Sequence, residues 1–139
     1  MASFSADLRA MVDLAKEDLR YVATQAIQDV LEGAQTTQRG ITQGAESFEV
    51  GKIPVGLTSD LVNSLSIDGS TGPQAYVTAI AGMELGDVLT FEWTTPHAMP
   101  IEYGWTTSVG TIVPGRFFVG ANAAKFPQFV EARAAEVRK

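Results

Sequence analysis

The chain has no cysteine and a single histidine, His97. Without cysteine it can form neither a disulfide framework nor a thiolate metal site, and one imidazole cannot hold zinc by itself. His97 stands between two prolines, and general-base catalysis there would need positioned partners that the sequence does not indicate. The nucleophile elbow, the phosphate-binding loop and the dinucleotide-binding glycine motif are also missing. We therefore expect no cofactor, no metal and no enzymatic activity.

Long apolar runs are missing as well. No stretch approaches the roughly 20 apolar residues that a transmembrane helix requires, so we expect no membrane partner. The 139 residues are 45% hydrophobic and carry a formal net charge of −6. This composition is typical of one globular domain over residues 1–139. The acidic balance disfavours tight binding to a phosphate backbone, which needs clustered Lys and Arg.

Positive charge is absent from the centre of the sequence, because residues 53–115 contain no Lys or Arg. The same segment contains six acidic residues. One interpretation is a solvated acidic face that aids solubility, and the other is a surface that faces nucleic acid without holding it. The acidic candidates for such a surface are Asp60, Asp68, Glu84, Asp87, Glu92 and Glu102.

Residues 5–32 predict a long amphipathic helix. They contain neither Gly nor Pro, and their apolar residues recur at steps of three and four. Gly33 follows where a glycine often ends a helix. At about 1.5 Å per residue the rod would be roughly 40 Å long, so its overhanging part would pack on a neighbouring subunit. Residues 33–50 are rich in Gln, Thr and Gly and predict a long flexible loop.

Alternating polar and apolar residues predict three strands, over residues 64–68, 74–81 and 88–93. Thr58 is the expected N-cap of a short helix before them, and a final helix should begin near Pro127. The expected fold is α+β: an antiparallel sheet of three to five strands with long N-terminal and C-terminal helices packed on one face. The expected core residues are Leu8, Val12, Ala15, Leu19, Val22, Phe91, Trp93, Phe129 and Val130.

Three short motifs resemble those of the tail-completion or neck proteins of long-tailed bacteriophages, the minor-tail-protein-Z-like family. The first is PVGLTSDLVNSL at residues 54–65, which keeps the family's Pro-Val start and Leu-x-Asn-Ser-Leu end. It is one residue longer than the family pattern and lacks the Asp-Thr-Gly turn. The second is MPIEYGW at residues 99–105, and the third is PGRFFV at residues 114–119.

The resemblance implies a structural virion protein of the neck, assembled in the host cytoplasm. Its subunits would form a homo-oligomeric ring, a hexamer favoured over a dodecamer, between the head-completion or stopper protein and the tail tube protein. Double-stranded DNA would pass through the ring, and the acidic residues above would be candidates for lining the channel. The candidates for subunit or partner contacts are Arg9, Lys16, Arg20, Arg39 and Arg116, together with the basic C-terminal helix.

Two other functions stay open from the sequence. One is a small hydrolase whose carboxylates are paired only in the folded chain. The other is an acidic binding module that neutralises a basic partner.

Overall fold

The computed structural model describes residues 2–6, 16–40, 48–55 and 59–138. It is an α+β fold that contains a four-stranded antiparallel sheet, which confirms the coarse expectation. The elements are β1 (Ala2–Ala6), α1 (Lys16–Ala34), β2 (Thr37–Arg39), β3 (Ile53–Val55), α2 (Asp60–Asn63), β4 (Leu65–Ile67), β5 (Ser70–Thr71), α3 (Ala75–Ala81), β6 (Leu89–Trp93), α4 (Ala98–Tyr103), β7 (Gly104–Thr106), β8 (Ile112–Pro114), α5 (Gly120–Ala123) and α6 (Phe126–Val137).

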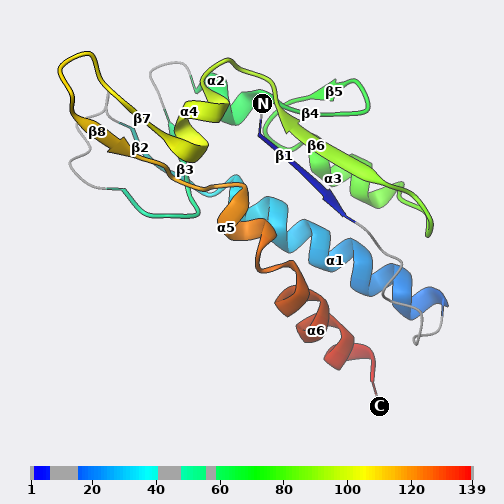
Figure 1. Ribbon diagram of the computed structural model, residues 1–139. Coiled ribbons are helices and arrows are strands. Elements are labelled where there is room, and N and C mark those ends of the chain that lie inside the picture. The colour runs from blue at the N-terminus through cyan, green and yellow to red at the C-terminus, as the bar shows by residue number, and fades with distance from the viewer. Residues whose placement is uncertain (1, 7–15, 41–47, 56–58, 139) are drawn as a thin grey trace.

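The main sheet has the strand order β1-β6-β4-β5 and one covered face (Figure 1). Along β6 the residues Leu89, Phe91 and Trp93 are buried. Between them, Thr90 is exposed and Glu92 is half-buried. This alternation is that of a sheet with one face in the core and the other toward solvent. Antiparallel pairing places Ser3 of β1 and Ser66 of β4 beside Glu92, so the outer face is polar.

Helices α1 and α3 supply the other half of the core. The apolar stripe of α1, including Val22, Ile27 and Leu31, is fully buried against the inner face of the sheet. The last helix, α6, lies along α1 (Figure 1), where Arg133 makes two hydrogen bonds to Asp29, at 3.0 and 2.9 Å. The carboxylate of Asp29 raises the pKa of Arg133, so the guanidinium stays charged at the helix contact.

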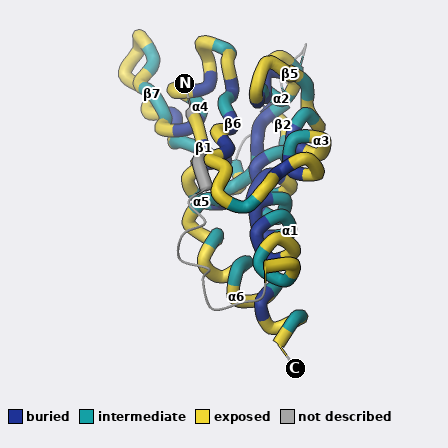
Figure 2. Tube along the Cα trace, turned by 90° about the vertical axis from the view of Figure 1, so that its right-hand side faces the viewer, coloured by how far each residue is buried: buried dark blue, intermediate teal, exposed yellow. Residues whose placement is uncertain are grey.

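Two smaller sheets accompany the main one. Strands β2 and β3 pair in parallel, and β7 and β8 form an antiparallel hairpin. Figure 2 shows the buried residues concentrated along α1 and the strands above it, whereas the β7 region and α6 are largely exposed.

The expected N-terminal helix is wrong at its start. Ala2–Ala6 form β1, whose Phe4 is buried and stacks on Phe91 with ring centroids 6.2 Å apart. In the sequence, Ser3 and Ser5 flank Phe4. The segment forms a strand because its five residues pair with the five residues of β6. The described helix α1 has 19 residues and runs past Gly33 to Ala34. Leu8, Arg9, Val12 and Ala15 lie outside the described residues.

The expected strand over residues 74–81 is also wrong, because this segment forms α3. Tyr76 and Ile80 are the buried residues, and Thr78 between them is exposed. A spacing of four between buried residues fits a helix that lies on the core, not a strand. The other two expected strands are confirmed as β4 and β6, and the final helix includes Pro127 in its first turn as predicted.

All six expected core residues that the structure describes contribute to the apolar core. Val22, Phe91 and Trp93 are buried, and Leu19, Phe129 and Val130 are partly buried against the same cluster.

The segment expected as a loop over residues 33–50 is partly regular. Residues 33 and 34 end α1, and residues 37–39 form β2. Thr36 accepts a hydrogen bond from the N–H of Ile53, which begins β3. Residues 41–47 lie outside the described part of the chain, as does Thr58, the expected N-cap; Ser59 holds that position, without a side-chain cap.

Gly33 is required by close packing within the last turn of α1. A Cβ atom on Gly33 would stand 2.1 Å from Oδ1 of Asn122. The Asn122 amide is buried and donates hydrogen bonds of 2.7 Å to the carbonyls of Gly51 and Phe118. The bond to Gly51 fixes α5 to the segment before β3, and only a residue without a side chain at position 33 leaves space for the Asn122 amide.

We expect Gly33→Ala to destabilise the protein, although Ala normally favours a helix by about 1 kcal/mol over Gly. The new methyl group displaces Asn122 and breaks two buried hydrogen bonds, at a cost of roughly 1–3 kcal/mol. In an Asn122→Ala background the clash is gone, so the same change should be stabilising by about 0.5–1 kcal/mol. Urea unfolding of the four proteins measures this reversal, and the same sign in both backgrounds would contradict it.

Candidate functional site

Three of the acidic candidates belong to α2, to the β4–β5 turn and to β6, elements that Figure 1 shows away from α6. Asp60 is exposed in the first turn of α2. Asp68 is exposed in the turn between β4 and β5, with a φ of 48° that Asp tolerates better than most residues. Glu92 is half-buried on the outer face of β6, between Ser3 and Ser66. None of the three carboxylates forms an ion pair with a described residue.

Two further candidates, Glu84 and Asp87, lie in the turn that joins α3 to β6. The Asp87 carboxylate accepts a 2.8 Å hydrogen bond from the N–H of Glu84, which closes the turn. Both residues are exposed. The structure therefore brings these two together and separates them from Asp60, Asp68 and Glu92.

Glu102 does not belong to the acidic surface, because its side chain is only 2% exposed. Its two carboxylate oxygens accept hydrogen bonds from the N–H groups of Val119, at 3.0 Å, and Gly120, at 2.7 Å. These amides begin α5 and have no partner within that helix. Glu102 therefore joins the end of α4 to the start of α5. The prediction that it lines a channel is corrected, because it is a buried structural residue.

The second and third sequence motifs form one packed unit around Glu102. The N–H of Arg116 donates to the carbonyl of Ile101 at 2.8 Å, and the N–H of Phe117 donates to the carbonyl of Glu102 at 3.1 Å. A Cβ on Gly104 would stand 2.6 Å from the carbonyl oxygen of Val113. The Glu-Tyr-Gly and Pro-Gly-Arg segments, which are apart in the sequence, therefore pack against each other in the folded chain.

The prediction that Arg116 contacts a subunit or partner is also corrected, since the residue is only 2% exposed and offers no surface for a partner. Its guanidinium lies 3.5 Å from the centroid of the Phe48 ring and 5.5 Å from that of Trp105. Its Nη1 donates to the carbonyl of Pro114 at 3.0 Å, whereas its Nε has no hydrogen-bond partner among the described residues. Burial lowers the pKa of Arg116 below its usual value.

The other basic candidates have different environments. Arg20 donates to the carbonyls of Met83, at 3.0 Å, and Ala81, at 3.1 Å, and so caps the end of α3. Lys16 is exposed at the start of α1, and Arg39 is exposed on β2. Arg9 lies outside the described residues, so its expected role in a contact stays a prediction.

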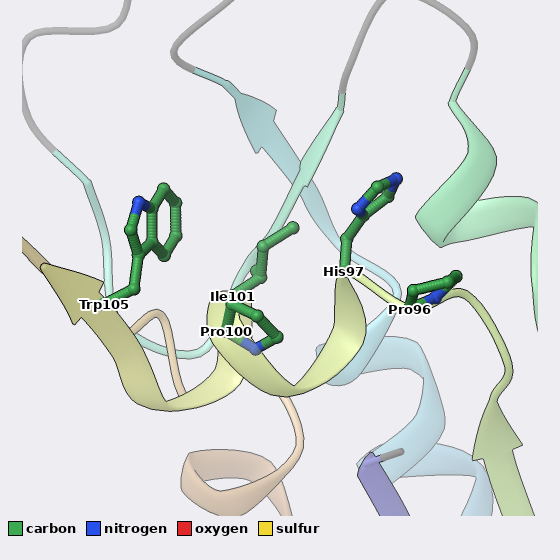
Figure 3. Close-up of a pocket in the computed structure, with 5 residues that line it drawn as sticks. All are labelled: Pro96, His97, Pro100, Ile101 and Trp105. Atoms are coloured by element: carbon green, nitrogen blue, oxygen red, sulfur yellow. The ribbon is translucent and has the colours of Figure 1, made fainter. Parts of the chain in front are cut away.

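His97 lines a shallow apolar hollow of about 460 Å³ above α4, together with Pro96, Pro100, Ile101 and Trp105. Figure 3 shows the rings of His97 and Trp105 standing on either side of Ile101. The lining supplies one imidazole and no carboxylate. Among the described residues, no group of three or more His, Asp and Glu side chains could hold a metal ion.

Comparison with protein-family models, with curated proteins and with solved structures finds no match for this chain. No helix in the described part is long and apolar enough to span a membrane.

The sequence analysis missed a group of exposed apolar side chains on and around the β7–β8 hairpin. Tyr103, Val109, Ile112 and Phe117 are all exposed. A signal was present, because residues 104–115 contain neither acidic nor basic residues. The missing Lys and Arg of residues 53–115 do not by themselves distinguish this uncharged segment from its acidic neighbours.

We expect Glu102→Ala to destabilise the fold by roughly 2–4 kcal/mol, because it leaves two amide donors without their charged acceptor. Glu102→Gln keeps one acceptor and turns an N–H₂ group toward the other amide, so an intermediate loss of about 1–2 kcal/mol follows. The matched control Glu84→Gln removes an exposed carboxylate and should stay within about 0.5 kcal/mol. Urea unfolding monitored by tryptophan fluorescence measures the order, and equal stability of all three variants would contradict the buried role.

Proposed function

We propose that the chain is a structural subunit of the bacteriophage neck. In this proposal its copies form a homo-oligomeric ring that joins the phage head to the tail tube and lets double-stranded DNA pass. The neighbours in the virion are a head-completion or stopper protein on one side and the tail tube protein on the other. The order of the three sequence motifs supports the proposal, and the arrangement of charge is its main physical support.

The observation that carries the proposal is the separation of charge between the two sides of the subunit. Asp60, Asp68 and Glu92 lie on the sheet side without ionic partners among the described residues. No Lys or Arg occurs between residues 53 and 115 to neutralise them. On the helical side, several opposite charges pair, among them Arg133 with Asp29 and Arg138 with Glu131.

An acidic wall suits a channel through which DNA moves. Each Lys or Arg that contacts a phosphate releases counterions and adds attraction, so a basic wall would hold the duplex. Carboxylates repel the phosphates at short range, and this field is screened within about 10 Å at moderate salt. We therefore assign Asp60, Asp68 and Glu92 to the channel side and the paired charges of α1 and α6 to the outside of the ring.

The polar outer face of the main sheet is compatible with such a wall. Ser3, Ser66 and Thr71 flank or approach Glu92 on strands β1, β4 and β5. These short side chains offer no large apolar area that would demand a covering protein. A hydrated face of this kind can border a water-filled channel.

We expect the purified chain to assemble into closed rings with an open centre, six subunits being favoured over twelve. Mass photometry gives the subunit number, and negative-stain images show the central opening. A chain that stays monomeric at every concentration tested would contradict the ring.

We expect Asp60→Lys combined with Glu92→Lys to create DNA binding without unfolding the protein. Each new lysine that contacts a phosphate should steepen the log–log salt dependence of binding by about 0.9. Fluorescence anisotropy with a short DNA duplex at several salt concentrations measures both affinity and slope. In the assembled neck the same variant should slow DNA passage.

The matched control is Glu17→Lys combined with Glu131→Lys. It changes the net charge by the same amount, but on exposed residues of α1 and α6. If both double variants bound DNA equally well, the gain would be a net-charge effect and the acidic channel would be rejected. That result would not contradict the proposed ring.

A stable one-to-one complex with a basic protein would instead favour the acidic binding module. The same acidic residues would then be the binding surface, and charge reversal would abolish the complex.

A further inference from the structure

The β7–β8 hairpin and its base form an uncharged projection. Residues 104–115 contain no Asp, Glu, Lys or Arg, and Figure 1 shows the hairpin extending outward beyond α4. Val109 is 86% exposed and Ile112 is 77% exposed. At the base, the exposed rings of Tyr103 and Phe117 contact each other with centroids 6.2 Å apart. Single exposed apolar residues are ordinary, but an uncharged projection rich in them is typical of the centre of a protein–protein contact.

The hairpin lacks the protection that exposed strands usually have. It pairs with no third strand in the described part of the chain. Its register places Trp105 opposite Val113, which is buried, and Thr106 opposite Ile112 on the other face. Two-stranded hairpins are marginally stable alone, and charged residues usually guard sheet edges against association. The absence of such charges indicates that the outward face is covered in the assembled protein.

The backbone at Phe117 supports the same conclusion. Its φ of 49° is in the left-handed region, which bulky residues rarely adopt. Its N–H donates to the carbonyl of Glu102, which holds the backbone there, and the residue is 39% exposed. Strain of this kind is found where it positions a side chain for function.

Two exposed apolar residues lie at the opposite end of the molecule. Val77 on α3 is 47% exposed, and Val88, just before β6, is 73% exposed. Between them in the sequence are the exposed Glu84 and Asp87. In Figure 1, α3 and the start of β6 lie at the end of the molecule away from β7 and β8.

The two ends also carry opposite charge. Figure 1 shows β2 at the hairpin end. Its residue Arg39 is exposed and forms no ion pair with a described residue. Glu84 and Asp87 at the other end likewise have no ionic partner in the described chain. Complementary charges favour the encounter of these ends and disfavour contacts between like ends.

We propose that the hairpin surface of one copy (Tyr103, Val109, Ile112 and Phe117) packs on the corner surface of the next copy (Val77 and Val88). Arg39 then lies toward Glu84 and Asp87 of that next copy. Because the surfaces differ and lie at opposite ends, the contact is head-to-tail, and it generates a closed ring when the rotation between copies divides a full turn. The inference rests on the ring of the proposed function and assigns its subunit contact.

The absence of cysteine permits a direct test by cross-linking. Ile112→Cys and Val88→Cys are introduced together, and a short bismaleimide reagent joins thiols that lie close to each other. The double variant should give a ladder of covalent species that ends at the ring number. Each single variant should give no covalent dimer, because equivalent residues of neighbouring copies are one subunit length apart.

The matched control pairs Val88→Cys with Ala132→Cys, which is exposed on α6. It should give no ladder. A covalent dimer from Ile112→Cys alone, at the yield of the double variant, would overturn the proposal in favour of a hairpin-to-hairpin contact.

A mixing experiment tests the direction of the contact without cross-linking. Ile112→Lys and Val88→Lys should each be monomeric with unchanged circular dichroism. Mixed together they retain one intact contact, so they should form a one-to-one dimer and nothing larger by mass photometry. If both variants still formed wild-type rings, the assigned contact would be wrong while the ring stood. If the wild-type chain itself never assembled, both the contact and the proposed function would fail.

Discussion

The buried carboxylate of Glu102 is the interaction on which this end of the fold depends. A carboxylate removed from water is costly unless its oxygens find donors, and here the first amides of α5 supply them. The same residue's carbonyl accepts the N–H of Phe117. One residue therefore fixes where α4 ends, where α5 begins and how the chain returns from the hairpin. The direction of the β7–β8 projection, and the left-handed backbone at Phe117, follow from that arrangement.

A second polar residue performs a similar task between α1 and the sheet. The Gln35 side chain donates to the carbonyls of Val62 and Pro73, each at 3.0 Å, and accepts the indole N–H of Trp93 at 2.8 Å. Trp93 is fully buried and contacts Phe118 edge to face. A Trp in a core needs a partner for its N–H, and this one is supplied by the residue that follows α1. These contacts couple the packing of α1, the main sheet and the segment that leads into α5.

These two constraints separate the surfaces that the proposed ring uses. The inner face of the sheet is occupied by α1 and α3, so charge on the strands must point outward. The hairpin is held away from the sheet by the packing around Glu102, which leaves its uncharged face free. The proposed acidic wall and the proposed subunit contact need different chemistry, and the fold keeps the residues assigned to them in different places. In the proposed assembly, DNA and the neighbouring subunit therefore do not compete for one surface.

The sequence by itself determined the fold class, the strands β4 and β6, the start of α6 and the polarised distribution of charge. Those features depend on local spacing and composition, which neighbouring residues in the chain express directly. Tertiary contacts decided the rest. Residues 2–6 became a strand because β6 offered a partner, and residues 75–81 became a helix because the core accepted Tyr76 and Ile80 at a spacing of four. Glu102 and Arg116 were expected at the surface, yet both are buried. Residues distant in sequence supply amide donors to the Glu102 carboxylate and aromatic rings to the Arg116 guanidinium. Spacing along a chain cannot show such partners, because they meet only when the chain has folded.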